Sequence, residues 1–337
     1  MALLSANQLT LLDVAKRLKP DGSVETEVAE LLSQTNAIVK DGVFVEANEK
    51  TAHRVTIRTG LPTVYYRSLN QGTPPSKSTT VQVKEGISLL EARATVDMKE
   101  LSISGDPAAL MMSESEPFLE AMNQRQAADT FYGNPAVDQR QYLGLAARYS
   151  VKSATNGQNI IDAGGVSTNN TSIWLVGWGP QTVFYTYPPG TMAGLQQRAL
   201  GEQRVLDVSG NAYQAMEVLY QWDNGLVVKD WRYATRIANI NVANLTSETG
   251  AADLMKLMSR AIDRIPQMGK CNPAFYGNRT VMSMLKVQAL NKSQNAIAVQ
   301  PALSQLGAVV PGQFEYQFLG IPLRLVDQIL STEAQVV

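Results

Sequence analysis

The chain has 337 residues, of which 45% are hydrophobic and only 18% are charged, and its net charge is −1. Soluble domains usually carry ~25% charged residues, and few charges with near-zero net charge favour association between copies. No overall basic field would attract nucleic acid or an anionic membrane. The single cysteine, Cys271, excludes an intrachain disulfide and predicts a reducing compartment. The sequence contains no run of about 18 apolar residues, so no membrane-spanning helix is predicted.

Two short amphipathic helices are expected at the N-terminus. Asn7 can cap the first, which places Leu11 and Leu12 on one apolar stripe, and Ser23 can cap the second, which carries Leu31. Because such short helices are marginal in isolation, both are expected to lie on a partner surface.

Residues 54–103 predict a long hairpin that leaves its own domain, entered through a strand-like segment at 38–46. Residues 54–70 alternate apolar and polar side chains, 70–80 are rich in turn formers, and 81–103 return at strand period. The first leg would extend roughly 50–60 Å, whereas a globule of this length has a radius of gyration of about 20 Å. An isolated ribbon is barely stable in water, so the arm needs support from its own sheet or from another molecule.

The middle of the chain predicts one helix and several strand-like segments. Residues 113–132 read as a helix with acidic residues and Pro117 at its start, ended by Gly133. Residues 150–225 are irregular apart from a strand-like run at 171–187, and 227–242 form a second long β-patterned segment.

The C-terminal part begins with the strongest helical pattern. Apolar residues over 254–265 follow helical spacing, and Asn278 can cap a further helix. Residues 318–326 read as strand–turn–strand around Gly320. Helices and strands mix without a regular βαβ repeat, which predicts an α+β fold.

A search for catalytic motifs finds little. His53 is the only histidine and excludes two-histidine zinc motifs, and we expect it to be a half-exposed strand residue. Ser283 and Lys286 match the Ser-x-x-Lys spacing, but its companion motifs are missing. Cys271 is expected to be a small apolar residue. The sequence therefore predicts no catalytic, cofactor or metal site.

The order of these elements resembles the major capsid proteins of tailed bacteriophages, whose fold is named after phage Hong Kong 97. Locally, NPAFYGNRTVMSML at 272–285 is similar to that family's axial-domain strand and helix, and FLGIPLRLVDQI at 318–329 is similar to its closing hairpin. The resemblance implies an α+β capsid fold with an N-terminal arm at 1–50, an extended E-loop at 51–104, a peripheral domain with the spine helix at 105–249, and an axial domain at 250–337.

The resemblance implies a structural protein, not an enzyme, that assembles through pentamers and hexamers into an icosahedral shell around double-stranded DNA. Its implied place is the virion, after assembly in the host bacterial cytoplasm. The family's fused assembly-guiding domain is not found at this N-terminus, which implies a separate scaffolding protein or a chain already processed, and Met1 favours the scaffolding protein. A portal protein and a decoration protein are further partners that the resemblance implies. Near-neutral charge predicts only weak, non-specific DNA contact. Two alternatives stay open: a nanocompartment shell of the same fold, and a soluble hydrolase using Ser283 and Lys286.

Candidate assembly residues follow from this interpretation. Lys77 lies where some family members carry a cross-linking lysine, but no acceptor is identified and no cross-link is predicted. Hinges are expected at Gly60, Gly86 and Gly133, where the arm and the spine helix would bend. Inter-subunit contacts are expected at Leu11, Leu12, Leu31, Tyr65, Tyr66, Leu69, Pro74, Pro75, Lys77 and Leu89.

Overall fold

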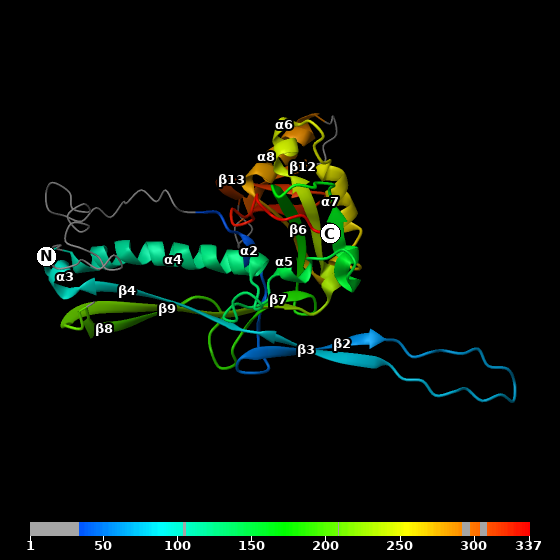
Figure 1. Ribbon diagram of the computed structural model, residues 1–337, viewed down its shortest axis with the longest axis horizontal. Coiled ribbons are helices and arrows are strands. Elements are labelled where there is room, and N and C mark those ends of the chain that lie inside the picture. Colours follow the sequence, from blue (N-terminus) through cyan, green and yellow to red (C-terminus); the bar gives the residue numbers. More distant parts are fainter. Residues whose placement is uncertain (1–33, 104–105, 208, 292–296, 304–308) are drawn as a thin grey trace. The chain divides into compact units, whose positions relative to one another are not determined.

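A computed structural model describes residues 34–103, 106–207, 209–291, 297–303 and 309–337 (Figure 1). The two predicted N-terminal helices, with Leu11, Leu12 and Leu31, lie outside the described residues. The chain forms two compact units, which are treated separately below. Unit 1 comprises Met1–Thr35, Leu89–Gln126 and Met192–Asp223, and unit 2 comprises Asn36–Ser88, Ala127–Thr191 and Asn224–Val337.

Unit 2 is built around a mixed sheet with the strand order β12-β13-β14-β11-β6-β7-β9, to which β1, β5 and β10 add further pairs. The central strand β6 is buried at every position, which explains its uninterrupted run of non-polar residues from Ile173 to Trp178. The strands are β1 Phe44–Glu46, β5 Ile160–Asp162, β6 Asn170–Trp178, β7 Val183–Tyr187, β9 Ala212–Val228, β10 Ala234–Asn241, β11 Asn272–Gly277, β12 Ile297–Leu303, β13 Val309–Phe318 and β14 Ile321–Leu325.

Helices pack with this sheet around one large core, which contains the fully buried Trp174 and Trp178. The helix predicted at 254–265 is present as α7, capped by Asp253, and the predicted cap Asn278 accepts the backbone N–H of Val281 at 2.9 Å. The helices are α2 Ile38–Asp41, α5 Leu145–Arg148, α6 Val242–Ser247, α7 Leu254–Ile262 and α8 Arg279–Asn291, with 3₁₀ turns η1 Thr155–Asn159, η2 Trp231–Tyr233 and η3 Met268–Lys270.

The last residues of the chain are held in unit 2 by a buried polar network around Glu333. Its carboxylate accepts hydrogen bonds from Arg236 at 2.9 Å, from Tyr132 at 2.5 Å and from Ser172. Arg236 also lies 5.1 Å from the centroid of the Trp174 ring. A buried charge is tolerated where it is paired and its remaining hydrogen-bonding groups are satisfied, as here.

The predicted hairpin exists as an antiparallel ribbon of β2, Ala52–Gly60, and β3, Thr79–Gly86, separate from the large sheet. The strand expected to run to residue 70 ends at Gly60, and residues 61–78 form no strand. Pro62 lacks a backbone donor and disfavours strand pairing at this point. A strand-like sequence without a partner does not form a strand by itself, since β-propensity depends on its neighbours.

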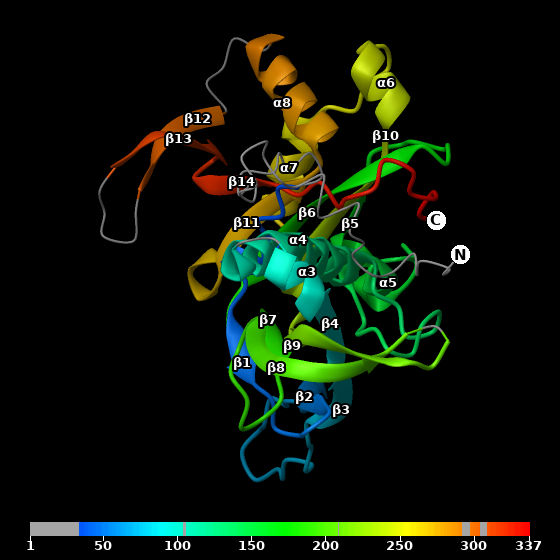
Figure 2. The same cartoon turned by 90° about the vertical axis from the view of Figure 1, so that its left-hand side faces the viewer.

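In unit 1, helix α4 lies along a three-stranded sheet of β4, β9 and β8 (Figures 1 and 2). Buried Val96 of β4 clusters with Leu110 of α4, and the ring of Phe118 stacks on Tyr220 of β9 at 6.3 Å. The elements are β4 Ser88–Asp97, α3 Met98–Ile103, α4 Pro107–Tyr132 and β8 Gln196–Leu206; β4, α4 and β9 each continue into unit 2.

The predicted helix at 113–132 begins six residues too late. Helix α4 starts at Pro107, where Asp106 accepts the backbone N–H of Ala109 at 3.1 Å and Pro107 occupies the first turn. Glu114 and Glu116 therefore lie inside the helix, not at its positive end. Pro117 is also interior, although proline usually marks a helix start or a kink.

Other strand predictions were wrong in their type or extent. Residues 98–103 form α3, with Asp97 accepting the N–H of Lys99 at 2.8 Å, and the segment at 38–46 divides into α2 and β1. The irregular region contains β8, which was missed because most of its residues are exposed and its apolar residues do not alternate, and it contains most of β9. The predicted long strand at 227–242 is interrupted by η2, where Asp230 accepts the N–H of Arg232 at 3.1 Å.

Candidate assembly interface

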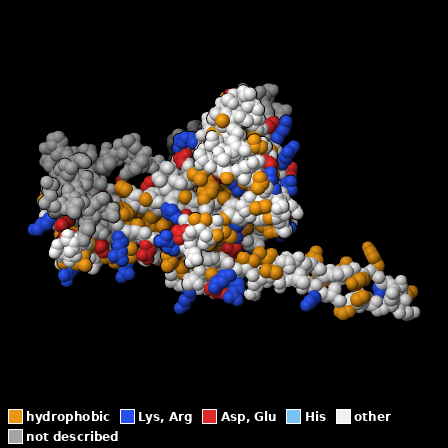
Figure 3. Space-filling view, in the orientation of Figure 1, with side chains coloured by type: hydrophobic (Ala, Val, Ile, Leu, Met, Phe, Trp, Pro, Cys, Tyr) orange, Lys and Arg blue, Asp and Glu red, His pale blue; other side chains and the backbone are white. Residues whose placement is uncertain are grey.

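The outer half of the arm exposes large apolar side chains. Leu61, Val64 and Leu69 are 82%, 87% and 91% exposed, and Tyr65 and Tyr66 are exposed as well. Figure 3 shows hydrophobic side chains gathered along this part of the ribbon. Isolated surface hydrophobic residues are ordinary, but a contiguous patch of this kind marks an interaction site. We call residues 61–78 the arm tip; it includes the predicted contacts Pro74, Pro75 and Lys77, all exposed.

The root of the arm, by contrast, is anchored in unit 2. Val55 is 4% exposed and packs with Phe184 and Val227. Glu85 on β3 receives a bidentate ion pair from Arg148 of α5, with N–O distances of 2.6 and 2.7 Å. Bidentate charge-assisted hydrogen bonds stabilise a contact and also fix its geometry. This pair therefore fixes the position at which β3 leaves the packed part of unit 2.

The guanidinium group of Arg148 makes several hydrogen bonds at the root of the arm. Beyond Glu85, its guanidinium donates to the carbonyl oxygen of Leu226 at 3.0 Å and to that of Leu143 at 3.2 Å. The pair is largely buried, with side-chain exposures of 12% for Arg148 and 7% for Glu85. Removing one partner would leave a buried charge without compensation, which makes the contact costly to break.

A second ion-pair cluster lies at the start of the arm. Glu49 binds Arg54 at 2.6 Å and Lys84 at 3.2 Å. The hydrogen bond from Lys84, together with the charges of Arg54 and Lys84, lowers the pKa of Glu49. Asn48 also accepts the backbone N–H of Arg54 at 2.8 Å. This cluster joins both strands of the ribbon to the turn that precedes them.

His53 is half-buried, as expected, and packs edge-on against Phe184 with ring centroids 5.4 Å apart. Burial and the nearby charge of Lys229 lower its pKa below the usual value. These contacts give His53 a packing role at the root of the arm.

The proposed hinge glycines differ in their surroundings. A Cβ atom on Gly133 would lie 2.5 Å from the carbonyl oxygen of Tyr142 and 2.6 Å from that of Asp129. One on Gly60 would lie 2.5 Å from Thr79 Oγ1, whereas Gly86 has open space around it. Close packing therefore explains the glycine at Gly133 without a hinge, and the hinge role remains a prediction at all three positions.

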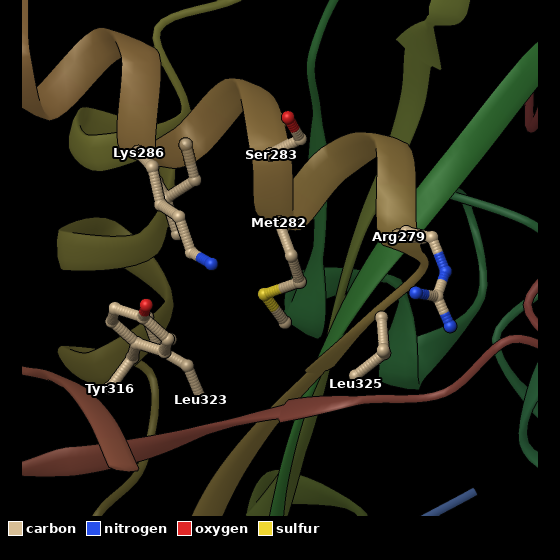
Figure 4. Close-up of a pocket in the computed structure, with 8 residues that line it drawn as sticks. Arg279, Met282, Ser283, Lys286, Tyr316, Leu323 and Leu325 are labelled. Atoms are coloured by element: carbon tan, nitrogen blue, oxygen red, sulfur yellow. The ribbon is translucent and has the colours of Figure 1, made fainter. Parts of the chain in front are cut away.

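Ser283 and Lys286 both line a cavity of about 290 Å³ between α8 and the β13–β14 strands. Figure 4 shows the Ser283 hydroxyl pointing away from Lys286, whose Nζ lies 4.0 Å from the centroid of the Tyr316 ring. An activated serine needs its base within hydrogen-bond reach, so this arrangement does not support the hydrolase alternative. Burial raises the pKa of Cys271, which makes its thiol a poor nucleophile.

Some interface residues had signals in the sequence and others had none. Leu61 and Val64 belong to the same alternating run as the predicted Tyr65 and could have been named with it. The Glu85–Arg148 pair joins positions 63 apart, and no local pattern links them. Leu89, the remaining predicted contact, is 69% exposed and lies on β4 in unit 1.

Within the described residues, no helix is both long and apolar enough to cross a bilayer. In the same part of the chain, no three His, Cys, Asp or Glu side chains gather closely enough to hold a metal ion.

Comparison with known proteins identifies the family. Residues 19–337 match the family model of the major capsid protein GP7. A chain in the structure of bacteriophage Epsilon15 is similar with a TM-score of 0.76 and 29% identity, over 100% of this chain and 99% of that one. The bacteriophage JBD30 capsid shares the fold at a TM-score of 0.50 and 9% identity, over 89% of this chain and 93% of that one. No curated protein sequence matches.

These matches confirm the predicted Hong Kong 97-type α+β fold and the predicted structural role. The protein is a subunit of an icosahedral phage head, associates with copies of itself, and is located in the virion. The chain belongs to the GP7 family of major capsid proteins.

Proposed function

We propose that this chain assembles through pentamers and hexamers into a head that encloses double-stranded DNA, and that the arm tip lies on a neighbouring copy. The single observation that carries this proposal is the anchored root combined with an exposed apolar tip. The ribbon is packed against its own chain at the root and exposed to solvent at the tip. Burying Tyr65, Tyr66 and Leu69 against another chain would therefore give a favourable hydrophobic free energy.

The finer parts of the proposal follow the same interpretation. The protein acts structurally, without catalysis, and is assembled in the host bacterial cytoplasm with a scaffolding protein, a portal protein and a decoration protein. The chain divides into an N-terminal arm at 1–50, an E-loop at 51–104, a peripheral domain at 105–249 and an axial domain at 250–337. The N-terminal residues Leu11, Leu12 and Leu31 contact a neighbour, and Gly60, Gly86 and Gly133 absorb differences between positions in the shell.

The test is deletion of residues 68–80, which removes Leu69, Pro74, Pro75 and Lys77. We expect shells or capsomers to be lost in electron micrographs, while circular dichroism and thermal unfolding of the remaining chain stay close to wild type. A matched control replaces the exposed Val137 and Val166 by serine, outside the arm, and should still assemble. Normal shells from the deletion variant would show that the arm is not the clamp.

The contents of the shells test the other half of the proposal. Head particles isolated from infected or expressing cells should contain DNA when the complete set of phage proteins is present. A co-purifying enzyme in place of DNA would favour the nanocompartment alternative.

A further inference from the structure

A small cavity in unit 2 combines an apolar interior with cationic side chains at its ends. Its volume is about 290 Å³, and it lies between helix α8 and strands β13 and β14 (Figure 4). Met282 and Leu285 line it from the helix, and Leu323 and Leu325 line it from β14. Because residues two apart on a strand point to the same side, both leucines belong to the side of β14 that faces α8.

Three residues of α8 define the length of this cavity. Arg279, Met282 and Lys286 are spaced i, i+3 and i+7, which places them along one face of the helix. Figure 4 shows Arg279 at one end and Lys286 at the other, with Met282 between them. The helical rise separates the two cations by about 10 Å along the helix axis.

The two cations differ in what neutralises them. Arg279 donates to the carboxylate of Asp327 from Nε at 3.3 Å and from Nη2 at 2.9 Å. Lys286 has no carboxylate partner among the described residues, and its Nζ lies 4.0 Å from the centroid of the Tyr316 ring. A cation–π contact attracts and orients the ammonium group but supplies no opposite charge. The Lys286 end of the cavity therefore attracts an anionic group.

The size of the cavity limits what can fill it. Sites for small organic ligands usually have volumes of about 300–1,000 Å³, so this one has room for one large apolar side chain and little more. The apolar surface continues outside the cavity, since Leu290, one helical turn beyond Lys286, is 85% exposed. A ligand that fills the cavity and also covers Leu290 must extend past Lys286, as a polypeptide segment can.

We propose that this cavity is a docking site for an acidic segment of a partner protein. The segment inserts one large apolar side chain against Met282 and Leu325 and places a carboxylate on Lys286 Nζ. Met282 and Lys286 are one helical turn apart, with about 5–6 Å between their Cβ atoms. The apolar residue and the carboxylate of the partner are therefore about one helical turn apart as well.

The composition of this contact sets its strength. Burial of the apolar side chain supplies most of the binding free energy, and the ion pair with Lys286 selects acidic over basic segments. One anchor and one solvent-exposed ion pair give a weak contact that is screened by salt. The site therefore suits a partner that binds the subunit reversibly.

Methyl NMR spectroscopy of the full, unassembled chain tests the proposal. The chain contains 12 methionines, and Met282→Leu identifies the resonance of Met282. The probe is a blocked alanine-based helical peptide with one leucine and, one turn later, one glutamate. Matched peptides replace the glutamate by lysine or the leucine by serine. The first peptide should shift the Met282 methyl signal, and each matched peptide should bind at least about tenfold more weakly.

Charge reversal on the protein separates recognition from folding. Lys286→Glu should exchange the preference, so that the lysine peptide binds more tightly than the glutamate peptide, whereas Lys286→Arg should keep the wild-type preference. The matched control, Lys256→Glu, makes the same charge change on an exposed side chain of α7 and should leave both affinities unchanged. Since Lys286 is exposed, its variants should keep the wild-type Tm, which thermal unfolding checks.

Other outcomes would overturn the proposal. Equal affinity for the glutamate and lysine peptides would show that Lys286 does not select the occupant. A shift of Met282 by hexanoate as large as that by the peptide, at equal concentration, would assign the cavity to small carboxylates. An unshifted Met282 with every probe would show that the cavity takes no such ligand. None of these measurements involves the arm or shell assembly, so each outcome leaves the proposed function unaffected.

Discussion

The chain contains two long hairpins, and their ends are built in opposite ways. The β8–β9 hairpin is paired from Gln196 to Leu206 and closes in a tight polar turn, where Asp207 accepts the backbone N–H groups of Ser209 at 2.9 Å and Asn211 at 2.7 Å. The arm pairs only from Ala52 to Gly60 on its first strand. Its tip has one described side-chain bond, from Ser76 to the carbonyl oxygen of Thr63 at 2.7 Å.

The difference follows from what supports each ribbon. The β8–β9 hairpin belongs to a sheet that packs on α4, so its own unit buries its apolar side and its turn can be polar and complete. The arm has a buried root but no supporting layer along its tip. An unsupported two-stranded ribbon is marginal in water. The comparison indicates that the β8–β9 hairpin makes its supporting contacts within its own chain, whereas the arm tip obtains them only when copies of the chain assemble.

The largest expected effect comes from breaking the arm root. Arg148→Ala leaves Glu85 buried without its cation and should lower the free energy of unfolding by about 3–5 kcal/mol. Urea unfolding followed by circular dichroism measures this change. The matched control, Arg140→Ala, removes the exposed pair with Asp138 and should leave stability unchanged. Equal effects of the two variants would show that the root is not a buried anchor.

A smaller effect is expected at the end of the spine helix. Gly133→Ala places a Cβ atom 2.5 Å from the carbonyl oxygen of Tyr142 and should cost about 1–3 kcal/mol of stability. Gly86→Ala enters open space and should be close to neutral. The melting temperatures of both variants, measured by thermal unfolding, show whether close packing or backbone flexibility accounts for the glycine at each position. If Gly133→Ala keeps full stability yet changes the shells that form, the hinge interpretation is favoured over packing.

Trypsin should cleave the arm tip about ten times faster than the β8–β9 hairpin. Arg67 and Lys77 on the unpaired tip are exposed, whereas Arg204 lies within the paired part of β8, and cleavage requires local opening of the backbone. Mass spectrometry of early digests of the free chain gives the order of cleavage. In assembled shells the tip sites should become protected. Continued rapid cutting at Arg67 in shells would contradict burial of the tip.

The smallest effect concerns the closed turn of β8–β9. Backbone and side-chain hydrogen bonds from Asn211 lower the pKa of Asp207 below its usual value of 3.8. A carboxylate with a lowered folded-state pKa contributes stability above its unfolded-state pKa, and that contribution is lost as the pH falls through the folded value. Asp207→Ala should therefore lower the Tm slightly at pH 7 and not at about pH 2. An equal change at both pH values would mean that the carboxylate charge does not stabilise the turn.

Local signals were sufficient where one short stretch decided the structure. Asn278 as a cap, the apolar spacing of α7 and the alternating strands of the arm root were all readable from the sequence. Pro117 misled the prediction of the spine helix, because the helix starts at Pro107, ten residues before Pro117, with its cap at Asp106. Strand β8 escaped detection because its stability comes from pairing with β9 and not from its own apolar pattern.

Contacts between distant segments were not predictable in this way. Glu85 meets Arg148, and Glu333 meets Arg236, only after the sheet has formed. The order of elements read from local patterns carried the resemblance to capsid proteins, and that resemblance supplied the domain roles that no local pattern contains. The exposure of the arm tip could be anticipated from length alone, since a leg of that size exceeds what its own globule can cover.

The cations Arg58, Arg67 and Lys77 on the arm, which form no ion pair with any carboxylate in the described part of the chain, also bear on the time before any shell exists. Newly made copies carry apolar tips and open ribbon edges at high local concentration, which is the usual route to aggregation. Because Arg58, Arg67 and Lys77 are alike in sign on every copy, two arms that approach each other repel. We therefore expect these residues to oppose aggregation of free subunits, and replacing them with neutral side chains should increase precipitation of the unassembled chain.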